Sequence, residues 1–316
     1  MKLLREVRGR MVARFCRAGF AKEALTGETD FSGLRAKPAL RVCAGREQGI
    51  LSPALLAGAA AFVISGFLLW VRPELALLPL GFFILLCLVA PFLTTVGFFL
   101  PVISRRDRGC NAVALTFDDG PDPEVTPLLL DVLGRHDVRA TFFVVGEKAK
   151  QCPELIHEIL SRGHTLGNHS YRHDPLLMLR SRTRLKKEIA HTQELLANFA
   201  VRPRAFRPPV GITNPRLKGV LQELGMYCLT FSCRAFDRGN RRIQKLAMII
   251  LKKVRPGDII LLHDVTPKGK EGIADWLTEM EQILSGLKSR GYEILPLAEL
   301  IDRPVMEPVA ADKANR

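Results

Sequence analysis

The apolar residues of this chain gather in one continuous stretch, residues 50–103, and then in a series of short runs after residue 111. Between residues 50 and 103 the only charged side chains are Arg72 and Glu74. Residues 51–71 are long enough to cross a bilayer once as a helix, and residues 75–103 are long enough to cross it again despite three prolines. The pattern predicts a hairpin of two transmembrane helices joined by a very short turn.

From residue 111 onward, short apolar runs alternate with amphipathic stretches. The apolar runs predict strands at 112–117, 140–145, 165–168, 205–207, 227–231, 258–263 and 293–296, and the amphipathic stretches predict helices at 124–136, 153–162, 181–199, 214–224, 241–254 and 272–290. Strands that alternate with helices indicate a parallel sheet. We therefore expect an α/β fold with a distorted (β/α)7-type barrel, in which chemistry gathers at the carboxyl ends of the strands.

Charge is distributed unevenly along the 316 residues, whose formal net charge is +14. Residues 1–49 hold 11 lysines and arginines against 5 acids, and Arg105, Arg106 and Arg108 follow the second apolar stretch. By the positive-inside rule, both ends of the hairpin and the domain after it lie on the cytoplasmic side of a bacterial-type inner membrane. If only the first stretch spans the membrane, the domain lies outside. Residues 1–20 fit either a basic amphipathic helix on an anionic leaflet or a disordered tail.

Other features of composition narrow the possibilities. The seven cysteines are scattered and form no CxxC pair, which suits reduced thiols in the cytosol. The chain has neither zinc-finger spacing nor the strand signature of an RNA-binding sheet, so no nucleic-acid partner is expected. The expected order is a basic cytoplasmic tail at 1–49, the hairpin at 50–104, a catalytic domain at 105–304 and a tail at 305–316. The sequence leaves the oligomeric state open.

The sequence Thr-Phe-Asp-Asp-Gly-Pro at residues 116–121 ends the first predicted strand with two adjacent carboxylates, Asp118 and Asp119. Two acids side by side at the end of a buried strand repel each other and lose hydration, so a metal ion or a cationic partner is the natural reason for the pair. Gly120 and Pro121 then turn the chain and leave both acids at the strand terminus. A helix N-cap would explain one of these acids but not both.

Histidines follow two other predicted strands. His169 and His173, in the sequence His-Ser-Tyr-Arg-His, would share a face if their segment turned helically. With one carboxylate they make a three-ligand set that leaves room for water and substrate, as in a catalytic metal site. His263 would bring to the same edge an imidazole suited to protonating a leaving amine, with a core histidine as the alternative. Arg207, at the end of the fourth strand, can orient a catalytic carboxylate.

Taken in order, these motifs resemble those of the NodB-type polysaccharide deacetylases, or carbohydrate esterase family four, over about residues 110–300. The resemblance implies a NodB-type barrel that hydrolyses the acetamide of an N-acetylated amino sugar with a divalent metal, Zn²⁺ first and Co²⁺, Mn²⁺ or Ni²⁺ as alternatives. The roles it implies are Asp118 as general base, Asp119, His169 and His173 as metal ligands, Arg207 as the residue that steadies the base, His263 as general acid, Asp237 as its partner, and Pro209 and Val210 as substrate contacts. The Val210 amide would face the oxyanion.

The chain departs from the family pattern at three positions. Val210 stands where the family usually has tyrosine, Arg238 where it usually has tryptophan, and Arg234 where it usually has an aspartate. Because arginines favour phosphate, we expect Arg234 and Arg238 to contact the substrate, a small amino sugar on a lipid phosphate at the inner leaflet. Residues 176–179 and the basic residues at 180–187 predict a loop that contacts the bilayer, with a solvated helix face as the alternative.

Three further functions stay open at this point. The chain also resembles the branch of the family that deformylates an aminoarabinose lipid, so a formyl group is an alternative to acetyl. An extracytoplasmic deacetylase of peptidoglycan or chitin is a second possibility. A membrane lectin that binds sugar without hydrolysis is the third, and the retained acids and histidines argue against it because binding needs no general acid.

Overall fold

The computed structural model describes residues 52–106, 109, 111–268 and 272–309. By its internal contacts the chain divides into residues 1–47 and residues 48–316, and every described residue belongs to the second unit. The predictions of a basic tail at 1–49 and of an amphipathic helix at 1–20 therefore lie outside the described residues.

Two apolar helices begin the described part of the chain. α2 spans Pro53–Val71, and the Ser52 hydroxyl caps its start by accepting a hydrogen bond from the Leu55 amide at 3.3 Å. One 3-10 turn, η2 (Pro73–Leu75), joins α2 to α3 (Leu78–Val89). The helical stretches Pro53–Val71 and Pro73–Phe92 are long and apolar enough to cross a membrane, and only 17% and 11% of their most apolar windows are buried. They are therefore not core helices of the domain that follows.

The second helix is shorter than the span expected over residues 75–103. The 3-10 turn η3 (Ala90–Phe92) ends it, because Pro91 has no amide to continue the hydrogen-bond ladder. The chain then turns onto the domain, where residues 98–100 are buried, and Val102–Ile103 form β1. The sheet thus begins before the boundary expected at residue 105.

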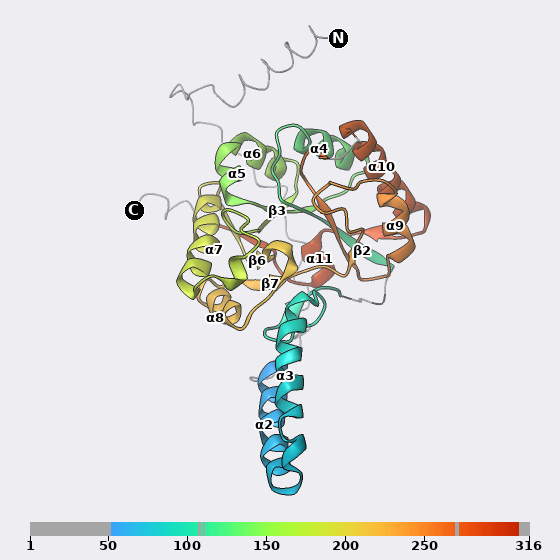
Figure 1. The fold of residues 1–316 in the computed structure, drawn as a ribbon. Helices are drawn as coiled ribbons and strands as arrows, with labels where there is room; N and C mark the ends of the chain where they lie inside the picture. The colour runs from blue at the N-terminus through green and yellow to red at the C-terminus, as the bar shows by residue number, and fades with distance from the viewer. Residues whose placement is uncertain (1–51, 107–108, 110, 269–271, 310–316) are drawn as a thin grey trace. The chain divides into compact units, whose positions relative to one another are not determined.

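A curled sheet of nine strands forms the centre of the domain within the described residues (Figure 1). Its order is β1-β7-β6-β4-β3-β2-β9-β8, with β10 also paired to β2, and the pairings between these strands are parallel. The strands are β2 (Ala112–Asp118), β3 (Thr141–Val144), β4 (Thr165–Asn168), β6 (Ala205–Phe206), β7 (Tyr227–Leu229), β8 (Cys233–Arg234), β9 (Ile259–His263) and β10 (Glu293–Ile294). The expected barrel-like α/β fold is confirmed.

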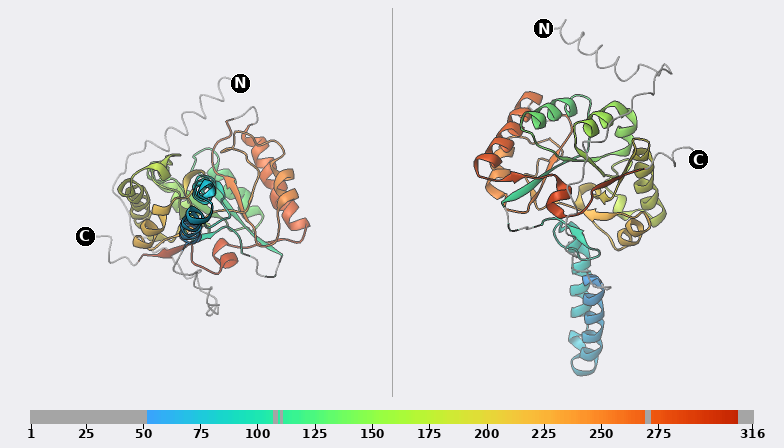
Figure 2. Two further views of the ribbon diagram at one scale, coloured as in Figure 1. Left: turned by 60° about the horizontal axis from the view of Figure 1, so that its bottom comes forward. Right: turned by 180° about the vertical axis from the view of Figure 1, so that it is seen from behind.

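Helices cover the outside of the curled sheet (Figures 1 and 2). They are α4 (Thr126–Arg135), α5 (Gly146–Gln151), α6 (Pro153–Ser161), α7 (Arg182–Ala197), α8 (Pro215–Glu223), α9 (Leu246–Lys253) and α10 (Ile273–Ser289). α10 shows why they lie there: Trp276, Met280, Ile283 and Leu287 recur at helical spacing and are all buried. The short helix α11 (Leu297–Ile301) instead packs on the core inside the curl. Outside the main sheet, β5 (Val201–Pro203) pairs antiparallel with β11 (Met306–Pro308), so part of the tail expected from residue 305 is structured.

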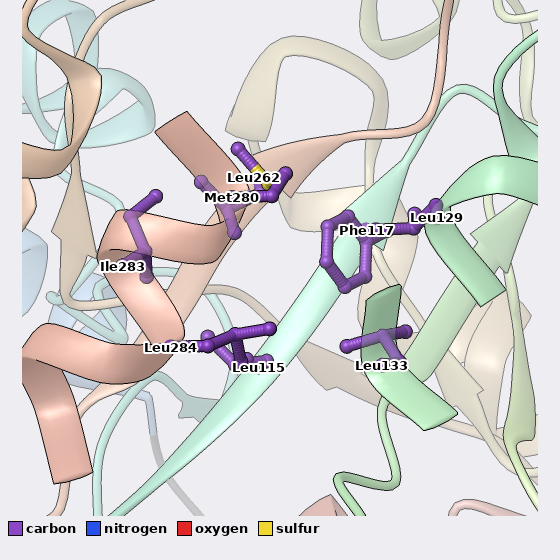
Figure 3. A pocket seen from close by; sticks show the side chains of 8 residues that line it. All are labelled: Leu115, Phe117, Leu129, Leu133, Leu262, Met280, Ile283 and Leu284. Atoms are coloured by element: carbon purple, nitrogen blue, oxygen red, sulfur yellow. The ribbon is translucent and has the colours of Figure 1, made fainter. Parts of the chain in front are cut away.

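A narrow gap between β2, β9, α4 and α10 is lined by apolar side chains alone (Figure 3). The lining residues are Leu115, Phe117, Leu129, Leu133, Leu262, Met280, Ile283 and Leu284, and they leave no room for a water molecule. This gap is therefore part of the close-packed core and not a ligand site. The chemistry of this fold lies elsewhere, at the carboxyl ends of the strands.

Candidate active site

The side chains of β2 divide between two cores because a strand has a period of two. Leu115 and Phe117 belong to the core under the helices, whereas Ala112 and Ala114 belong to a second core inside the curl of the sheet. Asp118 continues the second series. Its buried carboxylate therefore points into the barrel at the carboxyl end of the strand.

Parallel register brings the motif residues to one edge of the sheet. Asp118 is the register partner of His263 on β9. β4 and β6 end side by side in the same way, and His169 and Arg207 are the residues that follow them. The expectation that these motifs meet at the carboxyl ends of the strands agrees with this placement.

Asp118 is held by the Arg207 guanidinium, which is fully buried. Arg207 Nη1 donates to Asp118 Oδ1 at 2.6 Å and to Thr116 Oγ1 at 2.8 Å, while Nη2 donates to the Thr230 carbonyl at 2.9 Å. Burial lowers the pKa of Arg207 from its usual value, and the Asp118 carboxylate opposes this shift. The second carboxylate oxygen, Asp118 Oδ2, lies 3.8 Å from His169 Nε2 and faces the site.

Asp119, His169 and His173 converge on one point, and their candidate ligand atoms all lie within 4.8 Å of one another. Asp119 Oδ1 is 3.3 Å from His169 Nε2 and 3.1 Å from His173 Nε2. This buried oxygen nevertheless makes no hydrogen bond of acceptable geometry to any described residue. An unsatisfied carboxylate oxygen between two imidazole nitrogens is the arrangement that a divalent cation completes. The residues therefore fit a transition metal such as Zn²⁺, which imidazole ligands suit.

Neighbouring groups fix the protonation and the position of the three candidate ligands. His169 Nδ1 lies 2.8 Å from the Arg207 carbonyl, and because a carbonyl only accepts, Nδ1 carries the proton and Nε2 is free to act as a ligand. Burial opposes ionisation of Asp119, but His169 and His173 hold its pKa well below the ordinary value. Lys148 Nζ donates to the Asp119 carbonyl at 2.6 Å and fixes the backbone of that residue.

A loop brings His169 and His173 together. The expectation that their segment turns helically was therefore wrong. Ser170 and His173 both adopt left-handed backbone, with φ of 67° and 52°. The start of α5 holds the loop, because the Gly146 and Glu147 amides donate to the carbonyls of residues 170 and 171 at 3.0 and 2.8 Å. A Cβ at Gly146 would lie 2.6 Å from the Tyr171 ring, so this close approach requires glycine.

His263 faces the cluster from β9 and has its own carboxylate partner. His263 Nδ1 lies 2.7 Å from Asp237 Oδ2. Burial alone would lower the pKa of His263, but the Asp237 carboxylate raises it to about 9. The Asn240 side chain holds the turn by donating to the carbonyls of His263 and Val265 at 3.0 and 2.6 Å. The imidazole is thus a protonated acid at neutral pH, with Nε2 directed away from its partner.

The expected substrate contacts lie on two loops. On η5 (Pro209–Gly211), Pro209 is buried, whereas Val210 has left-handed backbone with φ of 53° and a side chain that is 52% exposed. On the β8 side, the Arg234 guanidinium stacks 4.0 Å from the centroid of the Phe236 ring. Burial lowers the pKa of Arg234, and Asp237 opposes this shift.

The loop of Arg238 approaches the metal cluster closely. Arg238 is exposed and adopts left-handed backbone with φ of 54°. At the next residue, Gly239, a Cβ would lie 3.6 Å from Asp119 Oδ2. The structure therefore brings two of the three departures from the family pattern, Arg234 and Arg238, to the same side of the site as His263.

Two groups at the site were not predicted from the sequence. Asp264 is wholly buried, and Thr126 Oγ1 lies 2.9 and 2.8 Å from its two carboxylate oxygens. Burial raises the pKa of Asp264 to about 7. A Cβ at Gly120 would lie 2.2 Å from Asp264 Oδ2, so glycine is required where the Asp118–Asp119 turn passes this acid. The only signal in the sequence was the position of Asp264 directly after His263.

The segment that leaves the apolar hairpin is the second unpredicted neighbour. Thr230 Oγ1 donates to the Thr94 carbonyl at 2.5 Å, and a Cβ at Gly211 would lie 2.9 Å from Thr94 Cγ2. The Thr230 carbonyl is the group that accepts from Arg207. A short chain of hydrogen bonds thus leads from the hairpin exit to Asp118.

Comparison with known proteins gives one consistent result. Residues 105–229 match the polysaccharide deacetylase family. A chitooligosaccharide deacetylase of Bradyrhizobium sp. is 34% identical over 221 residues, which make up 64% of this chain and 98% of that protein. A peptidoglycan-N-acetylglucosamine deacetylase of Bacillus cereus is 31% identical over 191 residues, or 60% of this chain and 87% of that protein.

The fold supports the same relationship. A crystal structure of a peptidoglycan N-acetylglucosamine deacetylase in complex with 4-naphthalen-1-yl-N-oxidanyl-benzamide matches with a TM-score of 0.59 at 29% identity. The match covers 65% of this chain and 94% of that one. Sequence motifs, sheet topology and relatives agree, and the chain belongs to the polysaccharide deacetylase family, whose members are hydrolases that act on carbohydrate amides.

Proposed function

We propose that this chain is a metal-dependent N-deacetylase that hydrolyses the acetamide of an N-acetylated amino sugar. The observation that carries the proposal is the arrangement of three groups: the Asp119–His169–His173 cluster, the arginine-held Asp118 beside it, and the protonated His263 opposite. A divalent metal held by the cluster would polarise the acyl oxygen and lower the pKa of a bound water.

Asp118 acts as the general base. Its Oδ1 is occupied by Arg207, which leaves Oδ2 free beside the cluster to take a proton from the attacking water. Arg207 orients the carboxylate by donating to Oδ1, and its positive charge pairs with the buried negative charge.

His263 acts as the general acid. Asp237 holds the proton-bearing Nδ1, so Nε2 of the imidazolium can protonate the departing amine. The Val210 amide, presented by the left-handed turn of η5, would donate to the negative charge that develops on the acyl oxygen. A backbone donor does not depend on the side chain, so the change from tyrosine to valine leaves this role intact.

The activity is tested by acetate release from N-acetylated amino sugars by the purified full-length chain, with and without added divalent metal. Asp118→Asn should keep the bound metal but lose about 100-fold or more of its turnover, because the amide cannot accept the proton of the water. Metal content by elemental analysis and acetate release are measured on the same samples of the wild-type chain and the variant. Full turnover by the variant would exclude Asp118 as the base.

We further propose that the amino sugar is carried on a lipid phosphate at the membrane surface, with acetyl as the first choice of acyl group and formyl as the second. Two observations support this substrate: the two exposed apolar helices directly before the domain, and Arg234 and Arg238 beside His263. Guanidinium groups bind phosphate oxygens in pairs. The positive-inside pattern supports a cytoplasmic site at an inner membrane.

The relatives favour a second candidate, a deacetylase of extracytoplasmic polymers, because those relatives are described as acting on chitooligosaccharide and peptidoglycan. The two candidates differ in the side of the membrane on which the site lies. Reporter fusions at Arg316 and in the turn near Pro73 decide this. Offering polyprenyl-phosphate N-acetylhexosamine beside chitin oligomers then tests the substrate, and acetate from the oligomers alone would exclude the lipid carrier.

A further inference from the structure

A short 3-10 turn beside the site holds two leucines in solvent. η4 spans Leu177–Leu179 and follows the His173 loop by three residues. Leu176 is 53% exposed and Leu179 is 75% exposed, whereas Leu177 and Met178 between them are buried. Among the described residues of the domain, no large apolar side chain outside the helical hairpin is more exposed than Leu179. Exposed apolar side chains of this size mark interaction surfaces when they are adjacent.

This turn is fixed in place, so its exposed leucines cannot relax into the core. The Met178 carbonyl accepts hydrogen bonds from Asn214 Nδ2 at 2.6 Å and from Arg216 Nη2 at 3.1 Å. Within the turn, the Leu179 amide donates to the Leu176 carbonyl at 2.8 Å. The buried residues thus serve as an anchor, and the leucines on either side are presented outward.

The anchor lies next to the base of the apolar hairpin. Leu177 and Met178 belong to the same hydrophobic cluster as Ala90, Phe98 and Phe99, which lie on the segment that leaves α3. The two exposed leucines therefore adjoin the point where the hairpin meets the domain. If the hairpin spans a bilayer, this point lies at the lipid–water interface.

The charge around η4 complements a phospholipid surface. Residues 172–187 contain six lysines and arginines and one acid, Asp174. Four of the six form ion pairs within the domain, with Asp174, Glu188 and Glu223, so the segment keeps a net positive charge. Several of these basic side chains are also exposed, including Lys186 and Lys187. Leucines flanked by long basic side chains are the composition of a membrane-surface segment, because the leucines enter the acyl region while the cations meet phosphate groups.

We propose that Leu176 and Leu179 insert into the interface of the bilayer that the hairpin spans, and that η4 is a second membrane contact of the domain. The inference rests on the membrane location given under the proposed function. This contact would hold the metal cluster close to the membrane surface, because His173 lies only three residues before Leu176. A sugar carried at headgroup level would then reach the metal cluster without leaving the membrane.

Tryptophan fluorescence in lipid nanodiscs tests this contact on the full-length chain. The chain has two tryptophans, Trp70 in the hairpin and the fully buried Trp276, so Trp70→Phe removes the one that lies in lipid. In that background, Leu179→Trp reports on η4. Met248→Trp on α9 is the matched control, because Met248 is 56% exposed and lies outside the cluster at the hairpin base.

Lipids brominated near the glycerol end of the acyl chains quench tryptophans that enter the interface. We expect at least twofold stronger quenching for Leu179→Trp than for Met248→Trp, with a blue shift of emission for Leu179→Trp alone. Equal quenching of the two variants would overturn the proposal, including the case in which a protein partner covers η4. This readout needs no turnover, so it can fail while deacetylation is observed, and it can succeed if the substrate is a different one.

A second measurement links the contact to catalysis. Leu176→Ser combined with Leu179→Ser should raise the KM for a lipid-carried N-acetylated sugar in nanodiscs by about tenfold and leave hydrolysis of soluble chitooligosaccharides unchanged. Equal effects on both substrates would mean that the leucines stabilise the domain rather than contact lipid.

Discussion

Asp237→Asn isolates the electrostatic control of the general acid. The Asp237 carboxylate makes the largest contribution to raising the pKa of His263 to about 9 against the effect of burial, ahead of Asp119 and Asp118. An asparagine keeps the size of the side chain and its hydrogen bond to Nδ1 but loses the charge. The pKa of His263 should then fall towards the ordinary value of about 6.5, because only the smaller effects of the Asp119 and Asp118 carboxylates still oppose burial.

The size of the effect follows from this shift. A change of about 2.5 pKa units corresponds to about 3 kcal/mol of interaction between the imidazolium and its surroundings. At pH 7.5 a histidine with a pKa of about 9 is about 97% protonated, whereas one with a pKa of 6.5 is about 9% protonated. Because the acid must be protonated to donate, kcat/KM should fall about tenfold at pH 7.5 and further above it.

The assay is the pH profile of kcat/KM for acetate release. The alkaline limb should move down by about two units or more in Asp237→Asn, with activity approaching the wild-type value as the pH falls below about 6. Asp131→Asn on α4 is the matched control, since that carboxylate is 55% exposed and should leave the limb in place. An alkaline limb that stays where it is in Asp237→Asn would refute the assignment of His263 as the titrating acid.

Three further predictions concern the metal cluster and its supports. Chelation should abolish the activity of the wild type, and re-added Zn²⁺ should restore it. His173→Ala should bind Zn²⁺ at least tenfold more weakly by titration because one of three ligands is gone, and an unchanged affinity would exclude His173 as a ligand. Arg207→Lys should lower kcat by about 100-fold and the free energy of unfolding by about 2 kcal/mol, because a lysine cannot make the three hydrogen bonds of the guanidinium. Steady-state kinetics and urea unfolding measure these two effects, and wild-type values of both would show that Arg207 does not support Asp118. Thr230→Val removes the donor to the Thr94 carbonyl, and we expect the free energy of unfolding to fall by about 1 kcal/mol, with a lower kcat and an unchanged KM. A change in KM alone would contradict a role of Thr230 in positioning Arg207.

Much of the fold could be predicted because its longer elements repeat with a clear period. β2 was expected at residues 112–117 and spans Ala112–Asp118, and α10 lies within one residue of its expected ends. Four shorter elements, β1, β5, β8 and α5, have two to six residues each, too few for a period to appear, and they were missed.

The site could be predicted in its membership but not in its geometry. The motif residues lie at strand ends, so parallel pairing alone brings Asp118, His169 and His263 to one edge. The approach of His173 depends on left-handed backbone, which no periodic pattern signals. Asp264 reaches Gly120 from a residue far along the chain, and a contact of this kind leaves no mark in either local sequence.

The burial of residues 98–100 bears on where this protein can be divided. The side chains of Phe98, Phe99 and Leu100 fill the same hydrophobic cluster as Leu185 and Leu217 of the domain, although they follow directly on the apolar hairpin. A fragment that starts at the family boundary near residue 105 would leave this cluster open to water. Soluble fragments for crystallography should therefore begin at or before residue 93, so that Thr94 and the three buried residues stay with the domain that they complete.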